Sequence, residues 1–386
     1  MNFASRTKNL TTEGAYQVLA KAHALEAKGR DIIHLEIGQP DFETFPNVSQ
    51  AGIQAIQDGY TRYTPPIGMK ELRQVISLDA GKRRGMDFHP DQVVVSPGAK
   101  PNLFFPTLAL VEEGDEVIYP NPGFPSYDAM IRVAGGKPVP VPLLENNQFS
   151  FDLDVFDQVI SNRTKLIILN SPGNPTGGII PMDDLSHIAE AAQKNDSWVL
   201  SDEIYARIIY EGFQADSIAT YPGMPERTVI MDGFSKTYSM TGWRLGYGIM
   251  PKELANKVSL LLTHSVGSTA QFTQIAGIEA LSGSQDQVDL VVSEYQKRRD
   301  LIVSGLNDLP GITCQKPQGA FYVFPNIKEI GKTSQEAADW ILEKAGVALL
   351  PGSAFGKFGE GYLRLSYANS RENIQKALDS LGVLLN

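Results

Sequence analysis

The chain carries a lysine at a position where its amine could do covalent chemistry. Lys236 follows an apolar run in the stretch MDGFSKTYSMTGWRLGYG, residues 231–248, and Arg244 lies eight residues further on. A lysine that attacks a carbonyl carbon must be desolvated or flanked by cations, so that its amine is neutral part of the time. Arg244 could be such a cation or the partner in a salt bridge. Lys236 considered alone would be a solvated loop residue.

Polar side chains follow other apolar runs in the same way. Asn174 lies in NSPGNPTGG, where it could form an Asx turn in a tight loop or point its amide into a ligand crevice. Asp202 is the last residue of WVLSD, and it could be a helix cap. Tyr205 follows three residues later and could be a core residue. In the functional interpretation, Asp202 is a carboxylate aimed at a ring nitrogen, which it keeps protonated so that the ring accepts electrons.

Two further stretches have the chemistry of anion binding. SPGAKPN places Gly98, Ala99 and Lys100 before Pro101, a residue well suited to the first position of a helix. A phosphate at that helix end would meet free backbone N–H groups and the positive end of the helix dipole. Arg364 lies in the otherwise apolar stretch GYLRLSYA, and its guanidinium suits a bidentate clamp on a carboxylate. The alternative is an edge-strand arginine that faces water.

These stretches follow short apolar runs that alternate with helical patterns. The runs are residues 92–96, 115–120, 165–170, 198–202, 228–232 and 244–250. Several are apolar almost throughout, which is typical of strands covered on both faces. The pattern predicts an α/β fold with a mainly parallel sheet, in which ligands bind outside the carboxyl ends of the strands. From about residue 251 the pattern is mostly helical, and GAFYVFP and GYLRLSYA predict strands of a second domain.

The composition excludes several classes of protein. Of the 386 residues, 42% are hydrophobic and 20% charged, and no apolar run approaches the ~20 residues of a membrane helix. The first residues have no secretory pattern, and with one cysteine no intrachain disulfide can form, so we expect a cytoplasmic protein. The five histidines are scattered, so no metal site is expected. A net charge of −10 argues against a nucleic-acid partner and favours small molecules.

Taken together, the motifs resemble those of the fold type I pyridoxal-phosphate enzymes of the class I/II aminotransferase family. GQPDF, YTPPIG, NSPGNPTGG, SDEIY, SKTYSMTGWRLGY and RLSYA follow one another in the family's order over nearly the whole chain. The resemblance implies a large cofactor-binding domain, residues 45–285, with a mostly parallel seven-stranded sheet. It also implies a smaller α+β domain from residues 1–44 and 286–386. The implied activity is transfer of an amino group from an L-amino acid to a 2-oxo acid by a homodimer.

The resemblance also implies a role for each candidate residue. Lys236 would form the internal aldimine with pyridoxal 5'-phosphate and then move a proton between the substrate α-carbon and the cofactor. Asp202 would pair with the ring nitrogen and Tyr205 with the phenolic oxygen. The other implied contacts are Ala99, Lys100, Ser235 and Arg244 at the phosphate, Tyr63 at the phosphate of the neighbouring subunit, Phe124 on the ring, Asn174 at the phenolic oxygen, and Arg364, Asn174 and the Gly38 backbone at the substrate α-carboxylate.

Some features leave alternatives open. Gly233 stands where many family members have a residue with a hydroxyl group. Phe124 stands where a stacking Trp or Tyr is common, so the stacking ring has no polar group here. The same cofactor also supports β- or γ-elimination, cyclisation or oxidation of an amino acid, and a fold does not choose among them. Lys100 could reach an acidic substrate side chain or stay solvated. A non-catalytic regulatory protein would need a DNA-binding domain, for which the chain has neither room nor basic charge.

Overall fold

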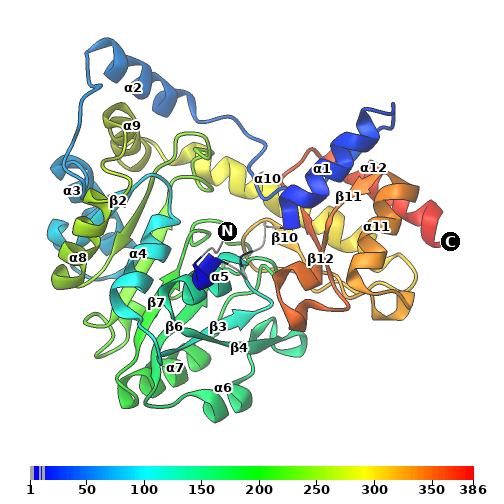
Figure 1. Ribbon diagram of the computed structural model, residues 1–386. Helices are drawn as coiled ribbons and strands as arrows, with labels where there is room; N and C mark the ends of the chain where they lie inside the picture. Colours follow the sequence, from blue (N-terminus) through cyan, green and yellow to red (C-terminus); the bar gives the residue numbers. More distant parts are fainter. Residues whose placement is uncertain (1–3, 8–9, 11–13) are drawn as a thin grey trace.

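The computed structural model describes residues 4–7, 10 and 14–386, and Figure 1 shows its α/β architecture. The α-helices are α1 (Gly14–Glu26), α2 (Pro46–Gln57), α3 (Lys70–Arg84), α4 (Pro101–Leu110), α5 (Ser126–Ala134), α6 (Leu153–Val159), α7 (Met182–Lys194), α8 (Lys252–Thr263), α9 (Gln271–Ser282), α10 (Asp286–Asn307), α11 (Ser334–Ala345) and α12 (Arg371–Leu385). The strands are β1 (Ile33–His34), β2 (Val93–Ser96), β3 (Glu116–Asn121), β4 (Lys137–Leu144), β5 (Ser150–Phe151), β6 (Thr164–Asn170), β7 (Trp198–Asp202), β8 (Thr228–Gly233), β9 (Gly246–Ile249), β10 (Tyr322–Val323), β11 (Val347–Ala348), β12 (Leu350–Pro351) and β13 (Leu363–Ser366). Short 3₁₀ helices are η1 (Ser5–Thr7), η2 (Pro90–Gln92), η3 (Glu145–Asn147), η4 (Ile218–Thr220), η5 (Lys328–Ile330), η6 (Gly352–Phe355) and η7 (Lys357–Gly359).

The large sheet has the order β2-β9-β8-β7-β6-β3-β4-β5. Strands β8, β7, β6, β3 and β4 are parallel to one another, whereas β9 is antiparallel to both of its neighbours. The expected mostly parallel sheet is therefore confirmed. Within the described residues it has eight strands rather than the seven expected, because the two-residue β5 pairs antiparallel with the end of β4.

Strand β4 was not among the predicted strands, and its sequence, KPVPVPLL, explains why. Proline has no N–H to give to a neighbouring strand and is confined to sheet edges. The N–H of Lys137 donates to the carbonyl of Asp115 on the β3 side. Because successive N–H groups alternate in direction, Pro138, Pro140 and Pro142 all face away from β3. The three prolines thus cost this pairing no hydrogen bond.

Both faces of the sheet are covered, as the nearly continuous apolar runs predicted. In β6, Leu166 and Ile168 pack in one cluster with side chains from α4 and α8. The alternate residues Ile167 and Leu169 pack in another cluster with side chains from α6 and α7. This alternation is the period of two that a strand imposes on its side chains.

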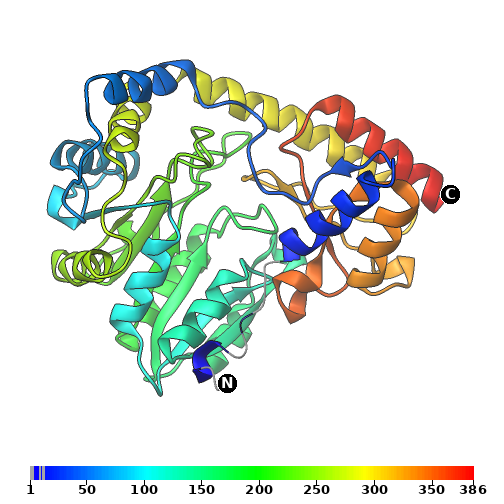
Figure 2. The same ribbon diagram turned by 45° about the horizontal axis from the view of Figure 1, so that its top comes forward.

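The C-terminal part forms smaller sheets. Strand β13 lies between β10 and β12, and it is antiparallel to both. Strand β1 pairs in parallel with β11, so residues from near both ends of the chain meet. Figure 2 shows helix α10 running from the α2 and α9 side of the large sheet to α12. The limits of the two domains, residues 45–285 and residues 1–44 with 286–386, remain a prediction.

The carboxyl ends of the parallel strands lie on one edge of the large sheet. Strand β2 runs in the same direction as β8, because each is antiparallel to β9 between them. The stretches after Ser96, Asn170, Asp202 and Gly233 therefore leave the sheet on the same edge.

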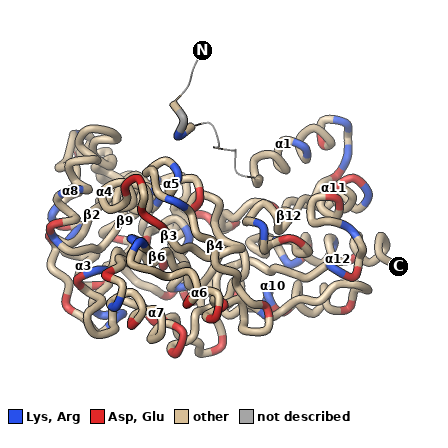
Figure 3. Tube along the Cα trace, turned by 60° about the horizontal axis from the view of Figure 1, so that its bottom comes forward, with Lys and Arg blue, Asp and Glu red and all other residues tan. Residues whose placement is uncertain are grey.

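In Figure 3, basic and acidic positions are interspersed along the trace. Among residues 4–7, 10 and 14–386, no helix combines the length and the apolar character needed to cross a membrane.

Candidate active site

Lys236 lies three residues after β8, and its amine is held near the backbone of a distant segment. Its Nζ donates a hydrogen bond of 2.6 Å to the carbonyl of Gly38. Burial, together with the nearby cations Arg364 and Arg244, lowers the pKa of Lys236 to about 8, against a smaller opposite effect of Asp202. These are the conditions that a nucleophilic lysine needs, since its amine is then neutral in a larger fraction of molecules near neutral pH.

Asp202 is the last residue of β7, and its carboxylate is buried. Its Oδ2 accepts a hydrogen bond of 2.7 Å from the Tyr127 hydroxyl, and its Oδ1 accepts one of 3.2 Å from the Ile204 N–H. Burial raises the pKa of Asp202 to about 7, although these hydrogen bonds oppose the shift. A buried acid in this state is suited to a cationic partner, because a nearby positive charge favours the carboxylate form. No helix among the described residues begins at Asp202, so it is not a helix cap.

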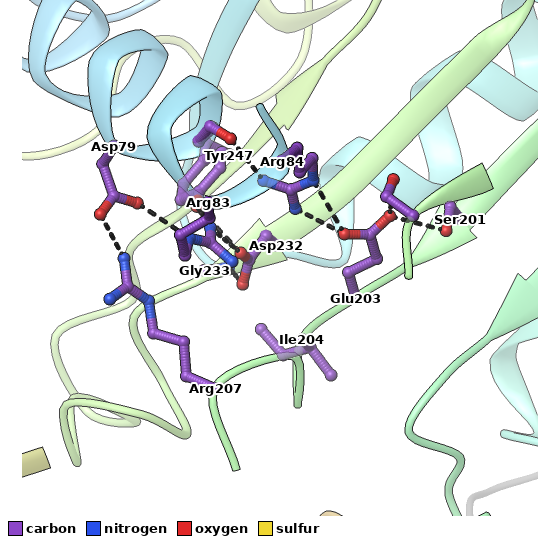
Figure 4. Close-up of polar contacts among 12 residues, drawn as sticks. Asp79, Arg83, Arg84, Ser201, Glu203, Ile204, Arg207, Asp232, Gly233 and Tyr247 are labelled. Carbon is purple, nitrogen blue, oxygen red and sulfur yellow. Dashed lines mark hydrogen bonds and ion pairs between the residues drawn. The ribbon is translucent and has the colours of Figure 1, made fainter. Parts of the chain in front are cut away.

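An ion-pair cluster fixes the strand ends that carry these residues. Figure 4 shows Arg83 and Arg84, at the end of α3, reaching the ends of β7 and β8. Arg84 pairs with Glu203, the residue after Asp202, and Arg83 donates a hydrogen bond of 2.9 Å to Asp232 in β8. Because Glu203 is buried, its pairing with an arginine offsets the cost of a buried charge. The cluster thus anchors α3 to both strand ends.

Tyr205 is buried three residues after Asp202, and its hydroxyl lies 2.7 Å from the hydroxyl of Tyr322. Burial is the main reason why the pKa of Tyr205 is raised well above its usual value, so its side chain is a neutral phenol. Tyr322 was interpreted from the sequence only as part of a strand. It is a site residue that sequence reasoning missed.

Arg364 is buried on β13, which has a neighbouring strand on each side. It is therefore not an edge-strand arginine facing water. Its Nη1 donates to the Asn174 side-chain oxygen over 3.2 Å, and its Nη2 donates to the carbonyl of Glu36. Its Cζ lies 4.5 Å from the centroid of the Tyr322 ring. The contact with Asn174 brings together the two side chains expected at a substrate carboxylate.

The turn between β2 and α4 lies against Arg244. Gly98 has a φ of +86°, and a Cβ at Gly98 would lie 2.2 Å from the Arg244 Nη2, so the guanidinium packs on the bare glycine backbone. Gly246 packs on the same turn, where a Cβ would lie 2.4 Å from the Ala99 nitrogen. Helix α4 starts at Pro101, as expected. The turn, Arg244 and a helix N-terminus together form a setting suited to an anion.

The remaining predicted residues are divided between this region and the surface. Ser235 is buried next to Lys236, and the Lys100 Nζ lies 5.0 Å from the centroid of the Phe124 ring. Tyr63 is 99% exposed.

A cavity of about 780 Å³ adjoins Arg244 and is lined by residues of α2, α9 and the segment 239–244. Neither Lys236 nor Asp202 lines this cavity, so it lies beside the residues that carry the chemistry.

Asn170 and Tyr127 are two further residues that sequence reasoning missed. The Asn170 side chain donates to the carbonyl of Asp202 over 3.0 Å and accepts from the N–H of Asn174 over 2.8 Å. Asn170 thus joins two predicted site residues. Its place at the end of a predicted strand was a usable signal. Tyr127 is the last residue of the glycine- and proline-rich stretch NPGFPSY, in which only Phe124 was predicted to be a site residue.

Comparison with known proteins is consistent with this arrangement. Residues 30–381 match the family described as aminotransferase class I and II. The chain belongs to this family. It is 40% identical to an aspartate aminotransferase of Pyrococcus horikoshii, over 92% of this chain and 91% of the relative. It is 38% identical to an aromatic-amino-acid aminotransferase of Thermococcus litoralis, over 92% of both chains. The solved structure of the Thermus thermophilus aspartate aminotransferase with maleate superposes with a TM-score of 0.95 at 36% identity, over the full length of both chains.

The family assignment confirms the resemblance found in the motifs and the fold type that it implied. The chain is an aminotransferase, and its family depends on pyridoxal phosphate. The relatives differ in the amino acid for which they are named, and the family therefore leaves the substrate open.

Proposed function

We propose that this aminotransferase binds pyridoxal 5'-phosphate through the residues assembled at the strand ends. The observation that carries the proposal is the partly desolvated Lys236, whose pKa is lowered to about 8, beside the buried carboxylate of Asp202. The residues fit the group. The Gly98 turn, Arg244, Ser235 and the backbone of Ala99 and Lys100 offer donors to a phosphate, Asp202 matches a protonated ring nitrogen, and Phe124 offers an apolar face.

Each residue would contribute a separate part of the chemistry. When bound, the cofactor supplies an aldehyde for the Lys236 amine and a ring that accepts electrons from the substrate α-carbon. Asp202 holds the proton on the ring nitrogen, and Tyr205 donates to the phenolic oxygen. Arg364, steadied by Asn174 and the Glu36 carbonyl, clamps the substrate α-carboxylate beside the Gly38 backbone. Lys236 would serve as the base that moves a proton between the substrate α-carbon and the cofactor.

We infer that the preferred amino donor is an L-amino acid with a second carboxylate, such as aspartate or glutamate. Arg364 would fix the α-carboxylate, which leaves the side chain to be bound elsewhere. Lys100, above Phe124 at the N-terminal end of α4, is a cation placed for a second carboxylate. The names of several relatives as aspartate aminotransferases, and the dicarboxylate maleate in the Thermus structure, support the same choice.

A panel of donors tests this substrate class. Aspartate and glutamate should convert the bound cofactor to its amine form in the absence of an acceptor, faster than alanine or phenylalanine do. In Lys100→Met, kcat/KM for aspartate should fall by roughly tenfold or more, because a charge-assisted hydrogen bond contributes about 1.5–3 kcal/mol. The value for phenylalanine should hardly change. Absorbance spectroscopy follows both reactions.

Lys332→Met is the matched control for Lys100→Met, because Lys332 also lies over an aromatic ring, that of Trp340. Its kinetic constants should equal those of the wild type. An equal loss for aspartate and phenylalanine in Lys100→Met would contradict the assignment of Lys100 to the side-chain carboxylate. Release of ammonia or of a cyclised product in place of the amine form would contradict transamination.

We further propose that the enzyme is a homodimer in which Tyr63 reaches the phosphate bound by the neighbouring subunit. The exposed side chain of Tyr63 and the exposed apolar side chains of Ile53, Ile56 and Val266 support this proposal. Ile53, Ile56 and Val266 line the cavity beside Arg244, where a second subunit would cover them. We also propose a cytoplasmic location, which rests on the single cysteine. The division into two domains, residues 45–285 and residues 1–44 with 286–386, is likewise a proposal.

Tyr63→Phe tests the shared site. The variant should bind pyridoxal phosphate roughly tenfold more weakly, since a hydrogen bond to a charged group contributes about 1.5–3 kcal/mol. Tyr60→Phe, in the same loop, is the matched control and should bind it as the wild type does. Fluorescence titration gives both affinities. A monomer in analytical ultracentrifugation, or equal affinities for Tyr63→Phe and the wild type, would rule out the proposed contribution of Tyr63.

A further inference from the structure

Tyr322, on β10, is buried and contacts three parts of the candidate site. Its hydroxyl lies 2.7 Å from the hydroxyl of Tyr205. Its ring lies beneath the guanidinium of Arg364, with 4.5 Å between Cζ and the ring centroid. Gly38 closes a further side, because a Cβ at Gly38 would lie 2.1 Å from the Tyr322 hydroxyl oxygen. The position of this hydroxyl therefore depends on the bare backbone of Gly38.

The two hydroxyls form a pair with only two protons to share. Burial raises the pKa of both Tyr205 and Tyr322, so both side chains are neutral phenols. A phenol has one hydrogen to donate and an oxygen that accepts. If Tyr205 gives its hydrogen to another acceptor, its oxygen is left to accept, and Tyr322 is in place to donate to it. The pair can thus form a directed chain from Tyr322 through Tyr205.

We propose that Tyr322 is a positioning residue that donates to Tyr205 and so directs the Tyr205 proton toward the phenolic oxygen of the cofactor. This inference rests on the proposed binding of pyridoxal phosphate. Hydrogen bonds in a chain polarise one another, so Tyr205 is a stronger donor when it also accepts from Tyr322. A stronger donor stabilises negative charge on the phenolic oxygen. That stabilisation is largest when the nitrogen joining Lys236 to the cofactor has lost its proton, so the chain lowers the pKa of that nitrogen.

Tyr322→Phe isolates the hydroxyl from the other contacts of this side chain. The phenylalanine ring keeps its place under Arg364, and no new atom approaches Gly38. The matched control is Tyr367→Phe, because Tyr367 is also buried and its hydroxyl bonds the Tyr210 hydroxyl and the Ala320 carbonyl instead of Tyr205. The thermal unfolding of the cofactor-free variants shows whether each one is folded.

The experiment is a pH titration of the visible absorbance of the cofactor-loaded proteins. Tyr205→Phe should raise the pKa of the joining nitrogen. Tyr322→Phe should raise it by less, with a change of roughly two- to fivefold in the ionisation constant. In a Tyr205→Phe background, Tyr322→Phe should add no shift, because the residue through which it acts is gone. Tyr367→Phe should leave the titration unchanged.

Two results would overturn the proposal. One is an unchanged titration in folded Tyr322→Phe. The other is an equal shift in the presence and absence of the Tyr205 hydroxyl, which would mean that Tyr322 acts through Arg364 or through general packing. Failure of the proposed cofactor site is recognised separately, because borohydride would then not fix the cofactor to Lys236 in the wild-type protein.

Discussion

Replacing Lys236 with alanine should reduce the rate of transamination by at least roughly 10⁴-fold. Proton transfer by a positioned side chain alone contributes about 10² to 10⁴, and the variant also loses the nucleophile. In the wild-type protein, borohydride should fix the cofactor to Lys236, and peptide mapping should locate the product. Because the pKa of Lys236 is lowered to about 8, cofactor-free protein treated with limiting pyridoxal phosphate at that pH should be labelled at Lys236 before other lysines.

Lys252→Ala is the control for this prediction, since Lys252 lies at the surface and pairs with Asp91. It should keep full activity and the same labelling at Lys236. An active Lys236→Ala protein, or labelling spread evenly over the lysines, would refute the assignment of the nucleophile.

Replacing Asp202 with asparagine should lower kcat strongly while the protein stays folded. Removing one partner of a buried ion pair costs about 3–5 kcal/mol, which corresponds to a fall of roughly 10² to 10⁴ in rate. The reason is that asparagine cannot hold the positive charge on the ring nitrogen. A cofactor analogue methylated at that nitrogen carries the charge permanently, so it should restore part of the lost rate to Asp202→Asn.

The pH dependence of stability separates this effect from misfolding. The pKa of Asp202 is raised from 3.8 to about 7 in the cofactor-free fold. The folded state therefore binds one more proton than the unfolded state between these values, and this residue's contribution to stability falls as the pH rises from about 4 to 7. At pH 8, cofactor-free Asp202→Asn should unfold at a temperature no lower than the wild type does. A much lower unfolding temperature for Asp202→Asn, or no recovery of its rate with the methylated analogue, would argue against the charge-pairing role of Asp202.

The strand ends were predictable from the sequence because two local signals coincide there. Apolar runs such as WVLSD are buried strands, and the polar residues that follow them share one edge of a parallel sheet. The strands themselves were predicted to within a few residues. Lys236, Asp202 and Asn174 were selected in this way, and each lies at the carboxyl end of a strand or within four residues of it. Their roles stay predictions.

Other features depend on contacts between distant residues, which local patterns do not contain. Whether Arg364 faces water or the interior depends on β10 and β12, which flank β13 with two residues each. Tyr322 meets Tyr205 across 117 positions of sequence, and in GAFYVFP it has the pattern of a core residue. Strands β5 and β4 were missed for other reasons. Strand β5 has only two residues, and the three prolines of β4 give no strand signal.

The prolines of β4 have a consequence for the behaviour of the protein at high concentration. An open sheet edge exposes unpaired N–H and C=O groups, which can recruit a strand from another molecule and start aggregation. Pro138, Pro140 and Pro142 remove the outward donors from most of β4, and β5 covers its end. At the opposite edge, the N–H of Val95 donates to the carbonyl of Ile67. Each border of the large sheet is thus protected against intermolecular strand addition, which helps keep a sheet of this size from aggregating.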